Sequence, residues 1–145
     1  MNIIKAFEHA YRQKAAKKWD CIYVAVDIHG TIFKPTYSSF YSHNDEYYPY
    51  AKEVLQMMSR IKDIKLILWS STPSDILVKY WKNFYNNDNI IFNYINENPE
   101  VKDTDIASFK NKFYFNVGLD DKFGFEPEID WFQLRGFFLE KAVSR

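Results

Sequence analysis

The sequence has 145 residues, of which 47% are hydrophobic and 26% charged, and its formal net charge is zero. This composition predicts one folded globular domain over residues 1–145, and a neutral chain has no global attraction for nucleic acid or an anionic membrane. No stretch approaches the ~20 consecutive apolar residues that a membrane-spanning helix needs, so we expect no membrane partner. The single cysteine, Cys21, allows no intramolecular disulfide, and we expect a cytoplasmic location.

The first half of the chain shows a helix, a strand and a second helix. Residues 2–18 carry apolar side chains at helical spacing, which predicts an amphipathic helix. The continuous apolar run 21–26 predicts a strand buried on both faces, as in a parallel sheet. Pro49 favours the start of a helix that extends to about Ile61.

Residues 33–48 show no periodic apolar pattern and are too long for an ordinary connection. We therefore expect a flap or binding loop at this place. Its aromatic side chains could stack on a nucleic-acid base or pack against the following helix, and the sequence leaves both open. These residues are Tyr37, Phe40, Tyr41, Tyr47 and Tyr48.

Strand and helix patterns alternate to the end of the chain. Residues 64–69 predict a second strand, and Thr72 with Pro73 and Asp75 predicts a capped helix that runs to about Tyr85. The remaining predicted elements are strands over 90–95 and 113–119, a short helix over 101–109, and a last helix over 127–142. This alternation predicts an α/β three-layer sandwich around a mostly parallel, Rossmann-like sheet.

Chemically active side chains follow each predicted strand. They are Asp27 and His29 after the first, Ser70 after the second, Lys102 after the third, and Asp120 with Asp121 after the fourth. Ligands of open parallel sheets bind outside the carboxyl ends of the strands, where these side chains should gather. Each alone is an ordinary turn, cap or surface residue, but together they indicate a functional site.

The most specific pattern is residues 22–33, in which an apolar strand ends in Asp27 and the pair Gly30-Thr31 follows. This segment resembles the first motif of the haloacid dehalogenase (HAD) superfamily, Asp-x-Asp-Gly-Thr. His29 stands where that motif has its second aspartate.

Two further segments resemble the same superfamily. Residues 66–70 resemble its second motif, an apolar strand ending in Ser or Thr, and residues 115–121 resemble its fourth, an apolar strand ending in paired acids. The resemblance covers roughly residues 20–125 and implies a HAD-like fold. Because the chain has no room for a large cap domain, we expect a minimal-cap member with residues 33–48 as its flap.

The resemblance implies a Mg²⁺-dependent phosphohydrolase. Asp27 would attack phosphorus and form an aspartyl-phosphate. Mg²⁺ would be held by Asp27, Asp120 and the main-chain carbonyl of His29, with Asp121 binding directly or through water. Ser70 would hydrogen-bond the phosphoryl group.

A lysine should balance the charge of the nucleophile and the phosphate. Lys102 follows the third predicted strand, as the resemblance implies for small family members. Lys110 and Lys112 lie just ahead of the fourth strand and are alternatives.

The imidazole of His29 puts the acid/base step in question, because in the family's phosphatases an aspartate protonates the leaving group. His29 could do this itself, could suffice only for acidic leaving groups, or could mark a protein that binds without turnover. The substrate would be a phosphomonoester, with a nucleotide, nucleic-acid end, small metabolite or phosphoprotein all open. The alternatives are an inactive HAD-like binding or regulatory protein and, less favoured, a receiver-like phospho-accepting domain.

Overall fold

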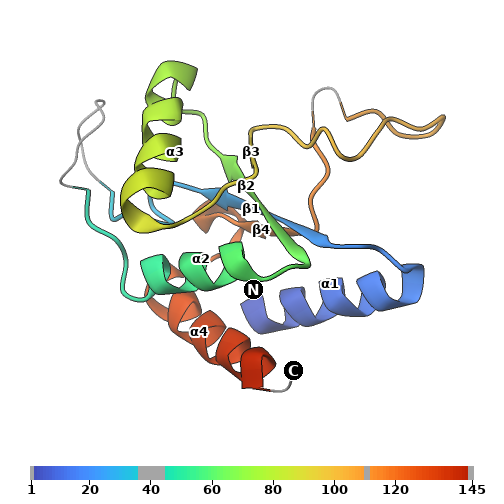
Figure 1. Ribbon diagram of the computed structural model, residues 1–145, viewed down its shortest axis with the longest axis horizontal. Coiled ribbons are helices and arrows are strands. Elements are labelled where there is room, and N and C mark those ends of the chain that lie inside the picture. The colour runs from blue at the N-terminus through green and yellow to red at the C-terminus, as the bar shows by residue number, and fades with distance from the viewer. Residues whose placement is uncertain (1, 36–44, 110–111, 144–145) are drawn as a thin grey trace.

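A sheet of four parallel strands forms the centre of the molecule, in the order β3-β2-β1-β4 (Figure 1). The computed structural model describes residues 2–35, 45–109 and 112–143. The elements are α1 (Ile3–Lys17), β1 (Ile22–Asp27), α2 (Ala51–Arg60), β2 (Ile64–Trp69), α3 (Ser74–Asp88), β3 (Tyr94–Ile95), β4 (Val117–Leu119), the short 3₁₀ helix η1 (Asp121–Phe123) and α4 (Pro127–Val143). The predicted α/β class with a parallel, Rossmann-like sheet is confirmed.

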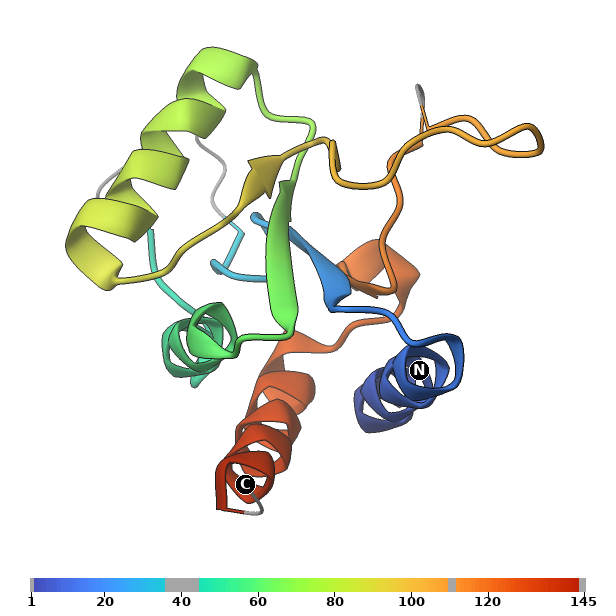
Figure 2. The same ribbon diagram turned by 45° about the vertical axis from the view of Figure 1, so that its right-hand side comes forward.

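The central strand β1 lies between β2 and β4 (Figure 2). It pairs with β2 along its whole length, from Ile22 beside Ile64 to Asp27 beside Trp69. Its pairing with β4 is shorter and ends with Val26 beside Leu119. Because the strands are parallel, Asp27 and the residues that follow Leu119 reach the same edge of the sheet.

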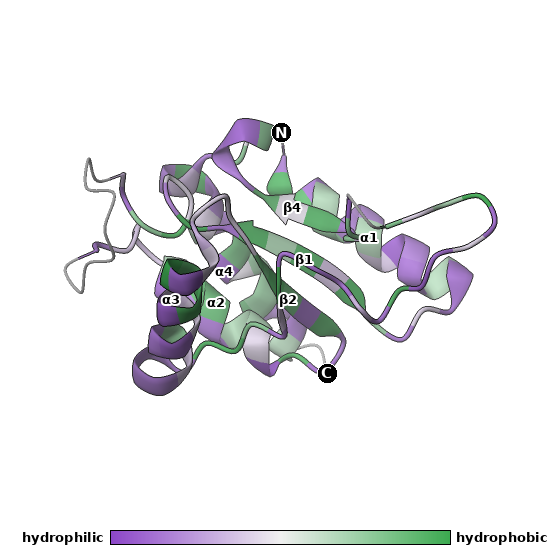
Figure 3. Ribbon diagram, turned by 90° about the horizontal axis from the view of Figure 1, so that it is seen from above, coloured by the Kyte–Doolittle hydropathy of each residue, from purple (hydrophilic) through white to green (hydrophobic). Residues whose placement is uncertain are grey.

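One face of the sheet packs against α1 and α2, and the core cluster on this face extends to side chains of α3 and α4. The strands β1 and β2 are largely hydrophobic in Figure 3, and their alternate side chains point into a single core cluster. The strand residues of this cluster include Val24, Val26, Leu66, Leu68, Val117 and Leu119. The helices add Phe7, Leu55, Phe84 and Trp131, which are all fully buried. Burial of these side chains supplies most of the driving force for this fold.

The opposite face is covered by residues 97–109 and 112–116, which lie on the other side of the sheet from α1, α2 and α4 (Figure 1). Phe113 packs there against Ala25 and Ile67. Glu100 holds the segment in place, since its carboxylate accepts hydrogen bonds from Lys65 at 2.7 Å and from the hydroxyls of Tyr23 and Tyr94. An irregular segment therefore forms this outer layer.

The prediction of a short helix over 101–109 is wrong. Side-chain oxygens accept hydrogen bonds from backbone N–H groups that a helix would use. Thr104 Oγ1 accepts from Ala107 N at 3.1 Å, and Asp103 Oδ1 accepts from Phe109 N at 2.7 Å. Thr104 and Ala107 form a bridge instead.

Several predicted boundaries also shift. The predicted strands 90–95 and 113–119 shrink to β3 and β4, because most of their side chains fill the core or cover the sheet without joining the ladder. Helix α3 begins after Pro73, with no side-chain cap from Thr72. It runs to Asp88, three residues beyond the prediction, and Asn89 ends it with φ 54°.

The two described ends of the 33–48 segment pair with each other. Lys34 N donates to Glu46 O at 2.8 Å, and Tyr48 N donates to Ile32 O at 3.0 Å. Tyr47 and Tyr48 pack against the core, so the packing alternative holds for these two. Tyr37, Phe40 and Tyr41 lie outside the described residues, and the expected flap stays a prediction.

None of the described helices combines the length and the apolar character that crossing a membrane requires.

Candidate active site

Three carboxylates meet at the carboxyl edge of the sheet. Asp27 is the last residue of β1, and Asp120 and Asp121 directly follow β4. One carboxylate oxygen from each lies within 4.8 Å of the others. The predicted gathering of these acids at one edge is therefore present, and the parallel pairing of β1 with β4 causes it.

The turn after β1 fits closely against Asp121. Gly30 has φ +81°, and a Cβ added there would lie 3.1 Å from Asp121 Oδ2. Gly30 N donates to Phe33 O at 2.9 Å and Ile32 N to Ile28 O at 2.8 Å, which makes the turn tight. Glycine is needed at residue 30 for its conformation and for the space it leaves.

Thr31 links the two halves of the acidic cluster. Its hydroxyl donates to Asp27 Oδ2 at 3.3 Å and accepts the backbone N–H of Asp121 at 3.2 Å. Its side chain is fully buried, and its carbonyl accepts Nε1–H of Trp131 at 2.8 Å. Thr31 therefore orients the Asp27 carboxylate from a position that α4 holds fixed.

Asp120 is 5% exposed and is held by two donors. Its Oδ2 accepts Nε1–H of Trp69 at 3.1 Å, and its Oδ1 accepts Lys122 N at 2.9 Å in the first turn of η1. The sequence prediction did not include Trp69. The signal that could have found it is its position at the end of β2, where it lies beside Asp27.

The clustering of the acids changes their acidity. Burial, together with the charge of Asp120, raises the pKa of Asp27 from 3.8 to about 6. Partial burial and the hydrogen bond and charge of Asp120 raise the pKa of Asp121 as well. The cluster thus carries crowded negative charge, which a bound cation would relieve.

His29 lies beside the acids in the chain, but its imidazole contacts α3. His29 Nε2 lies 3.1 Å from the hydroxyl of Tyr80, with the two rings edge to face. That hydroxyl donates to Asp45 Oδ2 at 2.6 Å. Because the single hydroxyl proton is used on Asp45, Tyr80 accepts from His29 Nε2–H, and in a neutral ring Nδ1 carries the lone pair.

Ser70 follows Trp69 at the same edge, and its side chain takes part in a local turn. Its hydroxyl donates to Thr72 Oγ1 at 2.9 Å and accepts Thr72 N–H at 3.1 Å. Asn96 fixes the backbone of Ser70, accepting from its N–H and donating to its carbonyl, each at 2.9 Å.

The candidate lysines are less closely placed than the acids. Lys102 is exposed and lines a pocket that Trp69 also lines. Within the described part of the chain, Lys102 forms no ion pair with Asp27, Asp120 or Asp121. Lys112 is exposed, and Lys110 lies outside the described residues.

Of the predicted site residues, the structure brings Asp27, Asp120 and Asp121 together. It places Ser70 at the same edge in a turn of its own, and it places the His29 imidazole against Tyr80. Lys102 stands apart, across the pocket beside Trp69.

Comparison with known proteins identifies a fold and no function. No family model matches this chain, and no curated protein matches it. A solved structure of a conserved protein from Bacteroides thetaiotaomicron is similar, with 25% sequence identity and a TM-score of 0.60. The match covers 83% of this chain and 92% of that one.

Proposed function

We propose that this protein is a Mg²⁺-dependent phosphohydrolase that acts through an aspartyl-phosphate on Asp27. The observation that carries the proposal is the cluster of three carboxylates at the carboxyl edge of the parallel sheet. That edge is where α/β proteins bind their ligands. In the proposed reaction the carboxylate at the end of the central strand acts as the nucleophile, as carboxylates do in other covalent phosphotransfer reactions.

The donor set fits Mg²⁺, a hard ion that prefers oxygen ligands and commonly takes one or two carboxylates with phosphate oxygens and water. The raised pKa of Asp27 supports this fit, because it comes from burial and from the charge of Asp120, and a bound cation would offset both. Asp27 and Asp120 would hold the ion with the main-chain carbonyl of His29, and Asp121 would bind directly or through water. When bound, the ion neutralises repulsion between carboxylate and phosphate and polarises the phosphoryl group.

Thr31 supports the nucleophilic role of Asp27. Its buried hydroxyl donates to Asp27 Oδ2, and this hydrogen bond limits rotation of the carboxylate. The same hydroxyl accepts from the backbone of Asp121, which keeps nucleophile and acid pair in register. A fixed attacking oxygen lowers the entropic cost of reaching the transition state.

We assign the acid/base step to His29. Its Nε2–H is held by Tyr80, so the neutral ring presents Nδ1 as its base. The protonated ring would give its proton to the leaving oxygen, and the neutral ring would then take a proton from the attacking water.

Ser70 and Lys102 would bind the phosphoryl group. Rotation of one C–O bond turns the Ser70 hydroxyl from Thr72 Oγ1 to a phosphate oxygen. Lys102 has a long exposed side chain beside the pocket that borders Trp69, which favours it over the exposed Lys112. Its ammonium would contribute positive charge to the bound phosphate.

Phosphate release from an aryl phosphate tests the proposal, measured with Mg²⁺ and with a chelator. We expect release that needs Mg²⁺ and that falls at least about 10³-fold in Asp27→Asn, because the amide is not a nucleophile. Asp105→Asn is the matched control, since Asp105 is an exposed acid outside the cluster. An unchanged rate in Asp27→Asn contradicts the mechanism.

A binding or regulatory protein is the second candidate, and the contact between the His29 imidazole and Tyr80 favours it. Replacing His29 with Asp separates the two. A fall in phosphate release supports His29 as the working acid/base, whereas a large gain means that the natural residue suppresses turnover. Stable phosphorylation of Asp27 without turnover would instead support a receiver-like phospho-accepting domain.

We also propose that the protein is located in the cytoplasm.

A further inference from the structure

A pocket next to the acidic cluster points to the substrate class. Resting on the proposed function, we propose that this pocket binds the nucleobase of a nucleoside monophosphate whose phosphate lies at Asp27. The pocket has a volume of ≈ 480 Å³, within the range of small-ligand sites. It lies between the ends of β2 and β3 and the described residues of 97–109 and 112–113. Its lining includes Trp69, Asn96, Glu97, Lys102, Phe109 and Phe113.

Trp69 contacts both the pocket and the carboxylate cluster. Its indole lines the pocket, and its Nε1–H donates to Asp120 Oδ2 at 3.1 Å. Trp69 is also the sheet partner of Asp27, and paired residues of neighbouring strands project to the same face. The pocket and the carboxylate cluster therefore have Trp69 in common, which lines the first and donates a hydrogen bond to the second.

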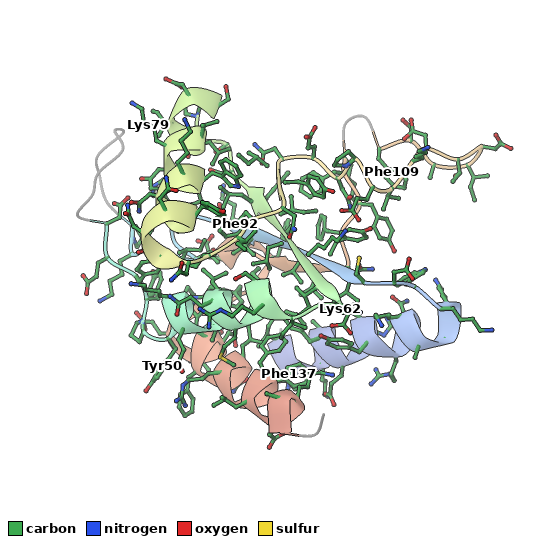
Figure 4. The ribbon with its side chains drawn as sticks, viewed as in Figure 1. Tyr50, Lys62, Lys79, Phe92, Phe109 and Phe137 are labelled. Atoms are coloured by element: carbon green, nitrogen blue, oxygen red, sulfur yellow. The ribbon has the colours of Figure 1, made fainter. Side chains whose placement is uncertain are left out.

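The walls of the pocket suit a flat aromatic ligand. The ring centroids of Trp69 and Phe113 are 5.2 Å apart at an interplanar angle of 61°, so Phe113 supports the indole. Trp69 is 37% exposed and lines the pocket, so part of its surface is open to a ligand. Phe109 adds a further aromatic ring to the lining, and its place in the segment 97–109 is labelled in Figure 4. Every nucleobase offers a π-face that stacks on such rings.

The polar part of the lining matches the edge of a base. Glu97 offers hydrogen-bond acceptors for the exocyclic amines of a base. The side chain of Asn96 is engaged on the backbone of Ser70, so it stiffens the wall. A phosphorylated sugar or aliphatic ester would leave the aromatic walls unused.

The first experiment compares kcat/KM for the four common nucleoside 5′-monophosphates with that for ribose 5-phosphate, which carries the same phosphate without a base. Stacking on one aromatic wall predicts a preference of about 5- to 100-fold for at least one nucleotide. Equal kcat/KM values for ribose 5-phosphate and all four nucleotides overturn the proposal.

The second experiment separates this proposal from the proposed function. Binding of the free nucleosides, which carry no phosphate, is measured by calorimetry without Mg²⁺. We expect Trp69→Phe to keep binding within about 3-fold and Trp69→Leu to lose about 10-fold or more, because only the second removes the aromatic face. Tyr85→Leu is the matched control, since Tyr85 is an exposed ring on α3 outside this pocket.

The outcomes are distinct for the two proposals. Nucleoside binding that depends on residue 69, without any Mg²⁺-dependent hydrolysis, supports the base pocket and contradicts the phosphohydrolase. Hydrolysis without nucleotide preference, together with absent nucleoside binding, supports the phosphohydrolase and overturns the base pocket.

Discussion

Gly30 and Asp121 approach so closely that residue 30 can carry no side chain without moving the acidic cluster. A Cβ on Gly30 would lie 3.1 Å from Asp121 Oδ2, and φ of +81° is strained for any residue with a side chain. The turn after β1 and the acid pair after β4 are therefore built against each other.

Gly30→Ala should lower the free energy of unfolding by about 1–2 kcal/mol, the cost of a left-handed conformation for a residue with Cβ. It should also weaken Mg²⁺ binding, because the added methyl displaces the Asp121 carboxylate. Urea unfolding and calorimetric titration of Mg²⁺ check the two effects.

The matched control is Gly136→Ala. Gly136 lies in α4, and a Cβ there meets nothing within 4 Å. Alanine should raise the free energy of unfolding by about 0.5–1 kcal/mol and leave Mg²⁺ binding unchanged. Equal effects of both substitutions would contradict the account of Gly30.

The raised pKa of Asp27 predicts a stability change with pH in the metal-free protein. Between pH 3.8 and about pH 6, the Asp27 carboxyl is mostly protonated in the folded protein and mostly ionised in the unfolded chain. The free energy of unfolding therefore falls as the pH rises through this window. Because solvent partly screens this carboxylate, the corresponding loss of stability at neutral pH is on the order of 1–2 kcal/mol.

Asp27→Asn removes that charge. Without Mg²⁺ it should therefore unfold at a higher urea concentration than the wild type at pH 7.5. The gain should shrink toward zero at pH 4, where the wild-type carboxyl is also neutral in the folded state. A variant that is no more stable at pH 7.5 would show that Asp27 carries no such penalty.

Mg²⁺ should stabilise the folded protein. An ion present at about ten times its Kd adds roughly 1.4 kcal/mol, which raises Tm by about 3–6 °C in a chain of this size. The shift should vanish in Asp120→Asn and persist in Asp105→Asn, measured by thermal unfolding at matched ionic strength. A shift of the same size in both variants would place the ion elsewhere.

Trp131 and Trp81 donate comparable hydrogen bonds to backbone carbonyls, but only the bond of Trp131 reaches a residue that contacts the acidic cluster. Trp131 Nε1 donates to Thr31 O and Trp81 Nε1 to Phe92 O, each at 2.8 Å. Trp131→Phe and Trp81→Phe should each cost about 1–3 kcal/mol, because a carbonyl loses its donor. Only Trp131→Phe should also weaken Mg²⁺ binding, and unfolding with Mg²⁺ titration tests the contrast. If the two variants bind Mg²⁺ equally well, the hydrogen bond from α4 to Thr31 does not help to position the acids.

The sequence predicts those parts of the molecule that local pattern determines. β2 matches its predicted range, and β1 differs by one residue at each end, since both are continuous apolar runs bounded by polar turns. The acid cluster was predictable because parallel strands bring their ends to one edge. In contrast, Phe113 belongs to an aromatic run that predicts a strand, but its side chain packs on one face of the sheet and the residue lies outside β4. Hydrophobic pattern does not separate these two uses of a phenylalanine.

Long-range contacts explain what the sequence does not predict at the site. Trp69 is an apolar strand residue by pattern, and its hydrogen bond to Asp120 spans 51 positions in the chain. The imidazole of His29 is directed by Tyr80, also 51 positions away. Partners so distant leave no local signal in a single sequence.

His29→Asn should lower kcat for an alkyl phosphate by about 10²–10⁴-fold, the usual contribution of general acid catalysis. The loss should be smaller for an aryl phosphate, whose leaving group needs less proton transfer. Mg²⁺ affinity should stay unchanged, because the proposed ligand at this residue is the main-chain carbonyl. Equal losses for both substrates would remove His29 from the acid role.

The most direct test of the central claim is mass spectrometry of the His29→Asn variant, quenched in acid after mixing with an aryl phosphate and Mg²⁺. Without its acid/base group the variant should hydrolyse the intermediate slowly and accumulate it. The account predicts one phosphoryl group on the peptide that contains Asp27, absent when Mg²⁺ is chelated. Phosphate release without any phosphorylated Asp27, or a phosphoryl group on another residue, would contradict it.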